Sequence, residues 1–173
     1  PERVGSVRGM GADTTTDEAV TIDLLAEHPE LVPTVGEIRW REWGHWPEPT
    51  ELSFWVDVTG AEAGTDALPV TWVAVNAAGE AVGAVALGEF DIDEVRDRSP
   101  WVMGMIVRED LRGRGIGTRL MRRLEDWAVT AGHPTIWVAT GGLAVAFYQS
   151  CGWEITELVE RPYDTATVLR RTP

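Results

Sequence analysis

Residues 110–121 read DLRGRGIGTRLM, a run of three glycines and three arginines in a chain whose formal net charge is −13. The run follows an apolar stretch (101–107) and precedes a segment of helical periodicity (116–132), so it occupies a turn between a strand and a helix. Glycines let backbone N–H groups converge on an anion, and a helix start adds unpaired N–H donors. Arginines such as Arg112 and Arg114 donate forked hydrogen bonds to phosphate oxygens. The spacing therefore indicates a diphosphate site.

Two common phosphate-binding motifs do not fit this run. The nucleotide-binding loop G-x-x-x-x-G-K-[ST] requires a lysine, and all 15 cationic residues of this chain are arginines. The dinucleotide fingerprint G-x-G-x-x-G fails in both registers, because its last glycine would fall on Thr118 or on Leu120.

Composition restricts the partners. A strongly acidic chain repels nucleic-acid backbones, and an acidic surface favours small cationic ligands instead. Cys151 is the only cysteine, which excludes an internal disulfide and agrees with a reducing cytoplasm. No apolar run approaches the ~20 residues of a membrane span, and no His, Asp, Glu or Cys group has metal-ligand spacing. We therefore expect a cytoplasmic protein without a membrane segment or a metal.

Elsewhere the periodicity predicts an α/β fold around one twisted sheet. Residues 1–18 are expected to form a flexible arm and 19–173 a single domain. Strands are predicted over 20–25, 70–76, 81–90, 101–107, 135–140, 153–160 and 165–171, and helices over 30–46, 49–59, 116–132 and 143–151.

Two segments together resemble a known family. Residues 112–117 fit [RQ]-x-x-G-x-[GA], and AVAFYQSCGW (144–153) fits A-x-x-F-Y-x-x-x-G-[FW]. Both are similar to motifs of the GCN5-related N-acetyltransferase (GNAT) superfamily, by motif over 101–155 and by element order over 20–171. The resemblance implies a mixed sheet of about seven strands flanked by about four helices, with acetyl-CoA as acetyl donor.

The resemblance also implies a cofactor site built largely from main-chain groups. The strand before the loop would offer backbone groups to pantetheine and to the thioester carbonyl. Many members carry asparagine where this chain has Gly141, so Thr140 is a candidate replacement. The expected cofactor residues are Met105, Ile106, Val107, Arg112, Gly113, Arg114, Gly115, Ile116, Gly117, Thr118, Thr140 and Tyr148.

Tyr148 is the expected general acid, since a phenol can donate a proton to the departing CoA thiolate. A buried tyrosine that only satisfies a hydrogen bond is the alternative. Cys151 has no base partner nearby in the sequence, so direct attack by the amine is favoured over an acyl-enzyme. An amine that arrives as ammonium needs a base, and Glu89 and Asp91 follow the strand 81–90.

Acceptor-side residues are less sharply indicated. Asp91, followed by Ser99-Pro100-Trp101, resembles the pattern of a GNAT branch that includes small-molecule acetyltransferases. Trp40 and Trp43 are candidates for a pocket wall. Tryptophans at helical spacing are more often core residues, which remains the alternative. The expected substrate-binding residues are Trp40, Trp43, Glu89, Asp91 and Trp101.

Charge and the branch resemblance favour a small cationic acceptor, with aminoglycoside antibiotics first, kasugamycin-like compounds included, and with antibiotic resistance as the consequence. Polyamines and amino-acid derivatives stay open. A protein N-terminus or lysine as the acceptor, and a CoA-binding regulatory module without turnover, are the alternatives. The sequence leaves a homodimer open.

Overall fold

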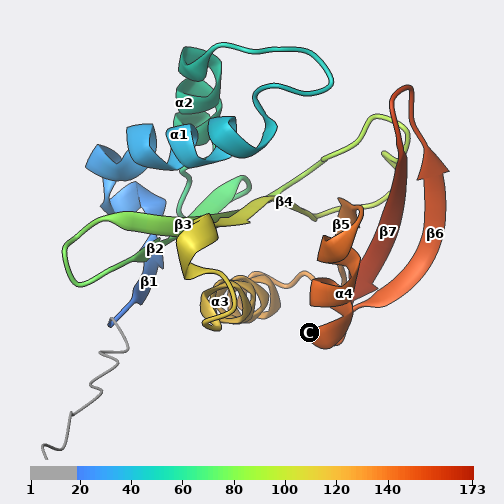
Figure 1. Cartoon of the computed structure of the whole chain (residues 1–173). Coiled ribbons are helices and arrows are strands. Elements are labelled where there is room, and N and C mark those ends of the chain that lie inside the picture. The colour runs from blue at the N-terminus through green and yellow to red at the C-terminus, as the bar shows by residue number, and fades with distance from the viewer. Residues whose placement is uncertain (1–18) are drawn as a thin grey trace, which may run out of the picture.

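The computed structural model of the chain describes residues 19–173, so the arm predicted over 1–18 lies outside the described residues. The described part contains one seven-stranded sheet with the strand order β1-β2-β3-β4-β5-β7-β6 (Figure 1). All neighbouring strands are antiparallel except β4 and β5, which are parallel. The strands are β1 (Thr21–Leu24), β2 (Val70–Val75), β3 (Ala81–Gly88), β4 (Trp101–Val107), β5 (Ile136–Thr140), β6 (Glu154–Glu160) and β7 (Thr165–Arg171), and the helices are α1 (Val32–Trp43), α2 (Leu52–Ala61), α3 (Ile116–Thr130) and α4 (Leu143–Ser150). This order confirms the predicted α/β fold.

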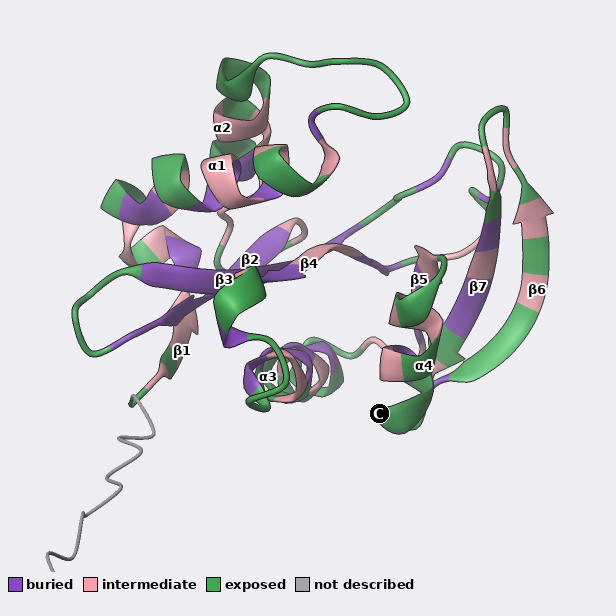
Figure 2. Cartoon of the chain, in the orientation of Figure 1, coloured by how far each residue is buried: buried purple, intermediate pink, exposed green. Residues whose placement is uncertain are grey.

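Helices cover both faces of the sheet. Successive side chains of a strand point to opposite faces, so the apolar strands present side chains for packing on each face. On one face, Val35 of α1 packs with Ala84 of β3. On the other face, Leu120 of α3 packs with Val85 of the same strand. Strand β3 is consequently buried along its whole length, whereas β6 at the sheet edge stays largely exposed (Figure 2).

Several element ends differ from the sequence prediction, and two of them place candidate site residues in loops. Helix α1 ends at Trp43, so His45 and Trp46 belong to the connection to α2. Helix α2 begins only at Leu52, beyond the prolines 47 and 49, which lack the backbone N–H of a helical residue. Strand β3 ends at Gly88, so Glu89 and Asp91 lie in the loop before β4.

The middle of the sheet is open. Strands β4 and β5 pair only at Trp101↔Trp137 and Val102↔Val138 and separate beyond these residues. At the same point β4 bulges against β3: Ala84 faces Ile106 and Ala86 faces Met103, so β4 carries one extra residue there. Gly104 stands in this bulge with a φ of +54°, which disfavours side chains. The second half of β4 thus has no neighbouring strand on its β5 side.

The core contact of α3 gives a first test. Leu120 is fully buried against the sheet, whereas Val129 on the same helix is 56% exposed. We expect Leu120→Ala to lower the free energy of unfolding by about 2–5 kcal/mol, because it leaves a cavity. The matched change Val129→Ala is expected to alter it by less than about 0.5 kcal/mol. Urea denaturation measures both, and equal losses would contradict the assigned packing.

Candidate active site

The glycine run forms the entry to α3, as the sequence predicts. Gly113 and Gly115 have φ values of +76° and +78°, and Gly115 is the N-cap of the helix. Gly117 is small for another reason: a Cβ there would lie 2.9 Å from the Met105 methyl group. The N–H groups of residues 116–118 are the orphan donors of the first helical turn. They lie where β4 ends, beside the opening between β4 and β5.

The two loop arginines differ in their surroundings. Arg112 donates from Nε to the carbonyl of Val107 and from Nη2 to Glu42 of α1, both at 2.9 Å. Arg114 is exposed, and within residues 19–173 its one hydrogen bond is a 3.5 Å contact with the carbonyl of Asp110, whose carboxylate also feels its charge. Arg112 therefore fastens the loop to α1, and Arg114 is the arginine whose charge is available to a phosphate.

The other expected cofactor residues belong to β4, to the first turn of α3 and to the end of β5. The side chains of Ile106 and Val107 are buried, so these residues can offer only main-chain groups to a ligand, and Met105 is half-buried. Thr140 ends β5 across from them. Thr118 is half-buried, and its hydroxyl hydrogen-bonds the Cys151 thiol.

Tyr148 of α4 is buried, with 3% of its surface exposed. Desolvation, assisted by the charge of Asp91 and by Cys151, raises the pKa of the phenol well above its usual value of 10. The side chain is therefore protonated at all physiological pH values. No hydrogen bond within residues 19–173 uses its hydroxyl, which leaves this donor to a ligand. Burial also raises the pKa of the Cys151 thiol, which fits a packing residue better than a nucleophile.

Asp91 lies in the loop that follows β3. The residue as a whole is exposed, yet the protein around its carboxyl group removes enough water to raise its pKa to about 6. Arg161 of the β6–β7 hairpin opposes this rise and Glu62, which caps the end of α2, adds to it. The charge of Asp91 contributes to the raised pKa of Tyr148.

Sequence reasoning missed a contact between two exposed aromatic residues, because distant segments bring them together. The ring of Trp46, in the α1–α2 connection, meets Tyr163 of the β6–β7 hairpin edge-on, with ring centroids 6.3 Å apart. Both are exposed, and Arg161 donates two 2.6 Å hydrogen bonds to Asp164 beside them. In the sequence, the three-residue spacing of Trp40, Trp43 and Trp46 was the signal that aromatic residues gather here.

Each tryptophan of the predicted pocket has a defined contact in the structure. Trp40 donates to the carbonyl of Thr50, and Trp43 stacks on Trp55 of α2, so both organise the α1–α2 connection. Trp101 is fully buried and packs against Trp137, which gives it a core position without access for a substrate. Glu89 is exposed beside Asp91.

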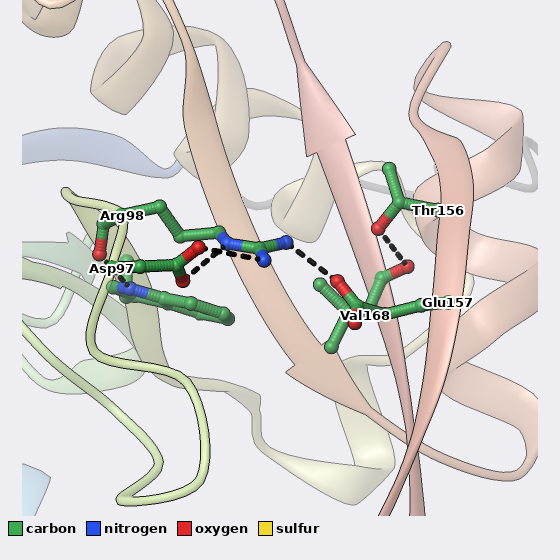
Figure 3. A network of polar contacts seen from close by, with 6 residues as sticks. Asp97, Arg98, Thr156, Glu157 and Val168 are labelled. Atoms are coloured by element: carbon green, nitrogen blue, oxygen red, sulfur yellow. Dashed lines mark hydrogen bonds and ion pairs between the residues drawn. The ribbon is translucent and has the colours of Figure 1, made fainter.

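The loop that carries Asp91 is anchored at its far end by Arg98 (Figure 3). This guanidinium pairs with Asp97 and bonds Glu157 of β6 at 2.5 Å, and it covers the ring of Trp137 at 4.7 Å. The main-chain carbonyl of Arg98 accepts a hydrogen bond from the indole N–H of Trp101. The loop is thus tied to β4, β5 and β6 at once.

A cavity of about 600 Å³ lies to one side of this arrangement, between α1, the β2–β3 turn and the end of β4. It shares Ile106, Val107 and Arg112 with the expected cofactor residues but contains no residue of β5 or α4. It is therefore not the opening between the two parallel strands. Within residues 19–173, no group of three or more His, Cys, Asp or Glu side chains could hold a metal ion, and no helix is long and apolar enough to cross a membrane.

Comparison with solved structures agrees with the geometry. An aminoglycoside 6'-N-acetyltransferase in complex with coenzyme A superposes with a TM-score of 0.72 at 16% identity, covering 88% of this chain and 96% of that one. An aminoglycoside 6'-acetyltransferase type Ii gives 0.68 at 18% identity over 88% and 96%. A GCN5-related N-acetyltransferase from Kribbella flavida gives 0.63 at 23% identity over 90% and 98%. At these identities the likeness shows the fold.

The sequence itself decides the family. No curated protein matches the chain significantly. The family model described as "Acetyltransferase (GNAT) family" matches residues 32–153, which include α1, the open strand pair, the glycine loop and Tyr148. The chain therefore belongs to the GNAT acetyltransferase family and is an acyltransferase.

Proposed function

We propose that this acyltransferase moves an acetyl group from acetyl-CoA to the amine of a small cationic acceptor, with aminoglycosides as the first candidates. One observation carries the proposal: the Asp91 carboxylate, whose pKa is raised to about 6, interacts electrostatically with Glu62 of α2 and with Tyr148 of α4. A pair of carboxylates attracts an ammonium group, and exposed aromatic rings such as those of Trp46 and Tyr163 attract cations as well.

The donor would bind at the opposite end of the opening. The orphan N–H groups of residues 116–118 and the charge of Arg114 suit the diphosphate of CoA. Between β4 and β5, the unpaired main-chain groups of residues 103–107 suit the amides of pantetheine. The aminoglycoside enzyme found with coenzyme A supports this donor.

The reaction follows from these positions. Asp91, ionised above pH 6, takes a proton from the acceptor ammonium, and the free amine attacks the thioester carbonyl. Main-chain N–H groups of the β4 bulge stabilise the oxyanion that forms. The tetrahedral intermediate then breaks its C–S bond and expels the CoA thiolate, and the new amide nitrogen releases its second proton to solvent. Because the pKa of Tyr148 exceeds the ~8.5 of a thiol, its hydroxyl assists by donating a hydrogen bond to the departing sulfur more than by complete proton transfer.

Acceptor identity can be tested by CoA release. We expect aminoglycosides to release CoA from acetyl-CoA, detected with DTNB, ahead of polyamines, amino acids and peptides with a free N-terminus or a lysine. Tyr148→Phe should lower kcat by about 10²-fold, since it removes one hydrogen-bond donor from the leaving group, and should leave CoA affinity nearly unchanged.

Three outcomes would count against the proposal. Turnover with peptides alone would favour a protein acceptor. CoA binding without turnover of any amine would favour a regulatory module. Equal losses of kcat and CoA affinity in Tyr148→Phe would remove the role given to the phenol.

The pH profile tests the base. Since Asp91 must be ionised, kcat/KM should fall as the pH drops through about 6. Glu62→Gln removes a like charge, lowers the Asp91 pKa and should move the acid limb to lower pH. Arg161→Met removes an opposite charge and should move the limb to higher pH.

Two variants serve as controls. Arg161→Lys keeps the charge, and Glu80→Gln changes an exposed carboxylate of the β2–β3 turn, so both should leave the limb in place. If Glu62→Gln and Arg161→Met moved the limb in the same direction, Asp91 would not be the titrating base.

A further inference from the structure

Arg39 is a buried charge that the reaction described above does not use. It lies on the inner side of α1 with 2% of its surface exposed, and it is among the largest fully buried side chains of the described residues. A buried guanidinium is costly unless it is paired, and replacement by an apolar side chain is often harmless to stability. Its presence at this point in the core therefore calls for an explanation from its contacts.

Only one nitrogen of the guanidinium, Nη1, has hydrogen-bond partners within residues 19–173. Nη1 donates to Glu62 Oε2 at 2.7 Å and to the Thr59 hydroxyl at 3.2 Å, both at the end of α2. Nε and Nη2 are buried and have no hydrogen-bond partner within residues 19–173. Arg39 consequently carries a positive charge that Glu62 neutralises from one side only.

The flat face of the same guanidinium lies against the β4 bulge. A Cβ on Gly104 would stand 2.8 Å from each of Cζ, Nε and Nη2 of Arg39. Two constraints therefore favour glycine at residue 104: its positive φ and the Arg39 guanidinium that lies against it. The bulge and the arginine fix one another's position.

Through Glu62, Arg39 is also linked to Asp91 on the proposed acceptor side. Glu62 keeps 17% of its side chain exposed, and its charge acts on Asp91. The charged and titratable groups that face Asp91 are Glu62 from α2, Arg161 from the β6–β7 hairpin and Tyr148 from α4. Of these, Glu62 is the one that Arg39 holds.

We propose that Arg39 is a positioning residue for acetyl transfer, which holds the Glu62 carboxylate beside Asp91 with one edge and supports the β4 bulge with its face. One buried cation thereby links the two halves of the site, the acceptor carboxylates and the strand that receives the acetyl group. The Nε and Nη2 edge of Arg39, which has no partner within residues 19–173, also lies beside the bulge where the oxyanion of the proposed reaction would form, a placement that favours the transition state. The kinetic consequence rests on the proposed function, whereas the link from Arg39 to Asp91 is a property of the free protein.

Titration of Asp91 tests the link without any turnover. The carboxyl resonance of Asp91 is followed by NMR against pH in the wild type, Glu62→Gln, Arg39→Met and the double variant. We expect Glu62→Gln to lower the Asp91 pKa in the wild-type background and to have little effect when Arg39 is absent. An equal shift in both backgrounds would overturn the proposal.

Matched variants separate positioning from general loss of structure. Arg41→Met removes an exposed arginine of the same helix that pairs with Glu37, and it should preserve the full effect of Glu62→Gln. Arg39→Lys keeps a charge that can bond Glu62 and should restore part of that effect. If Arg39→Met does not fold, Arg39→Gln takes its place in the cycle. Loss of the effect in Arg41→Met, or no restoration by lysine, would count against the proposal.

Kinetics complete the test. Misplacement of the bulge and of Glu62 should lower kcat of Arg39→Met by about 10²-fold, while the KM for acetyl-CoA changes less than about threefold. A parallel rise in that KM would indicate a merely structural role. Absence of turnover in the wild type would contradict the proposed function, and the NMR titration would still decide the role of Arg39.

Discussion

The separation of β4 from β5 is the constraint on which the rest of the structure depends. A parallel pair in the middle of a sheet normally continues, because buried backbone groups need partners. Here pairing stops after Val102↔Val138, so the second half of β4 presents its main chain to an open space. The bulge at Gly104 marks the same point on the β3 side. A ligand with amide and carbonyl groups can complete the hydrogen bonding that the sheet leaves unfinished.

Opposite charges at the two ends of this opening give the site its direction. One end has the start of α3 and Arg114, within a chain whose net charge is −13. The other end has Asp91 and Glu62, with the pKa of Asp91 raised to about 6. Under the proposed function, an anionic donor would enter at the first end and a cationic acceptor at the second. Tyr148, with its raised pKa, stays protonated between them.

Features that depend on only a few neighbouring residues could be predicted from the sequence. Glycines that need a positive φ, such as Gly113, and the 3.6-residue periodicity of α3 are properties of a few neighbouring residues, so the loop and all seven strands could be predicted. Contacts across the chain could not. The tie from Arg112 to Glu42 spans 70 residues, and it attaches the glycine loop to α1. Trp101, predicted at the acceptor, lies in the core because the loop before it folds over β5 and β6. Arg39 and Glu62 carried no motif, and only packing reveals them.

We propose that the opening between β4 and β5, and not the cavity beside α1, receives the cofactor. A titration with acetyl-CoA, followed through backbone amide resonances, distinguishes the two places. We expect the amides of Met105, Gly117 and Thr118 to shift and saturate together, while those of residues 34–38 and 79–81 at the cavity stay in place. Saturating shifts at the cavity, with Met105 and Gly117 unchanged, would contradict it.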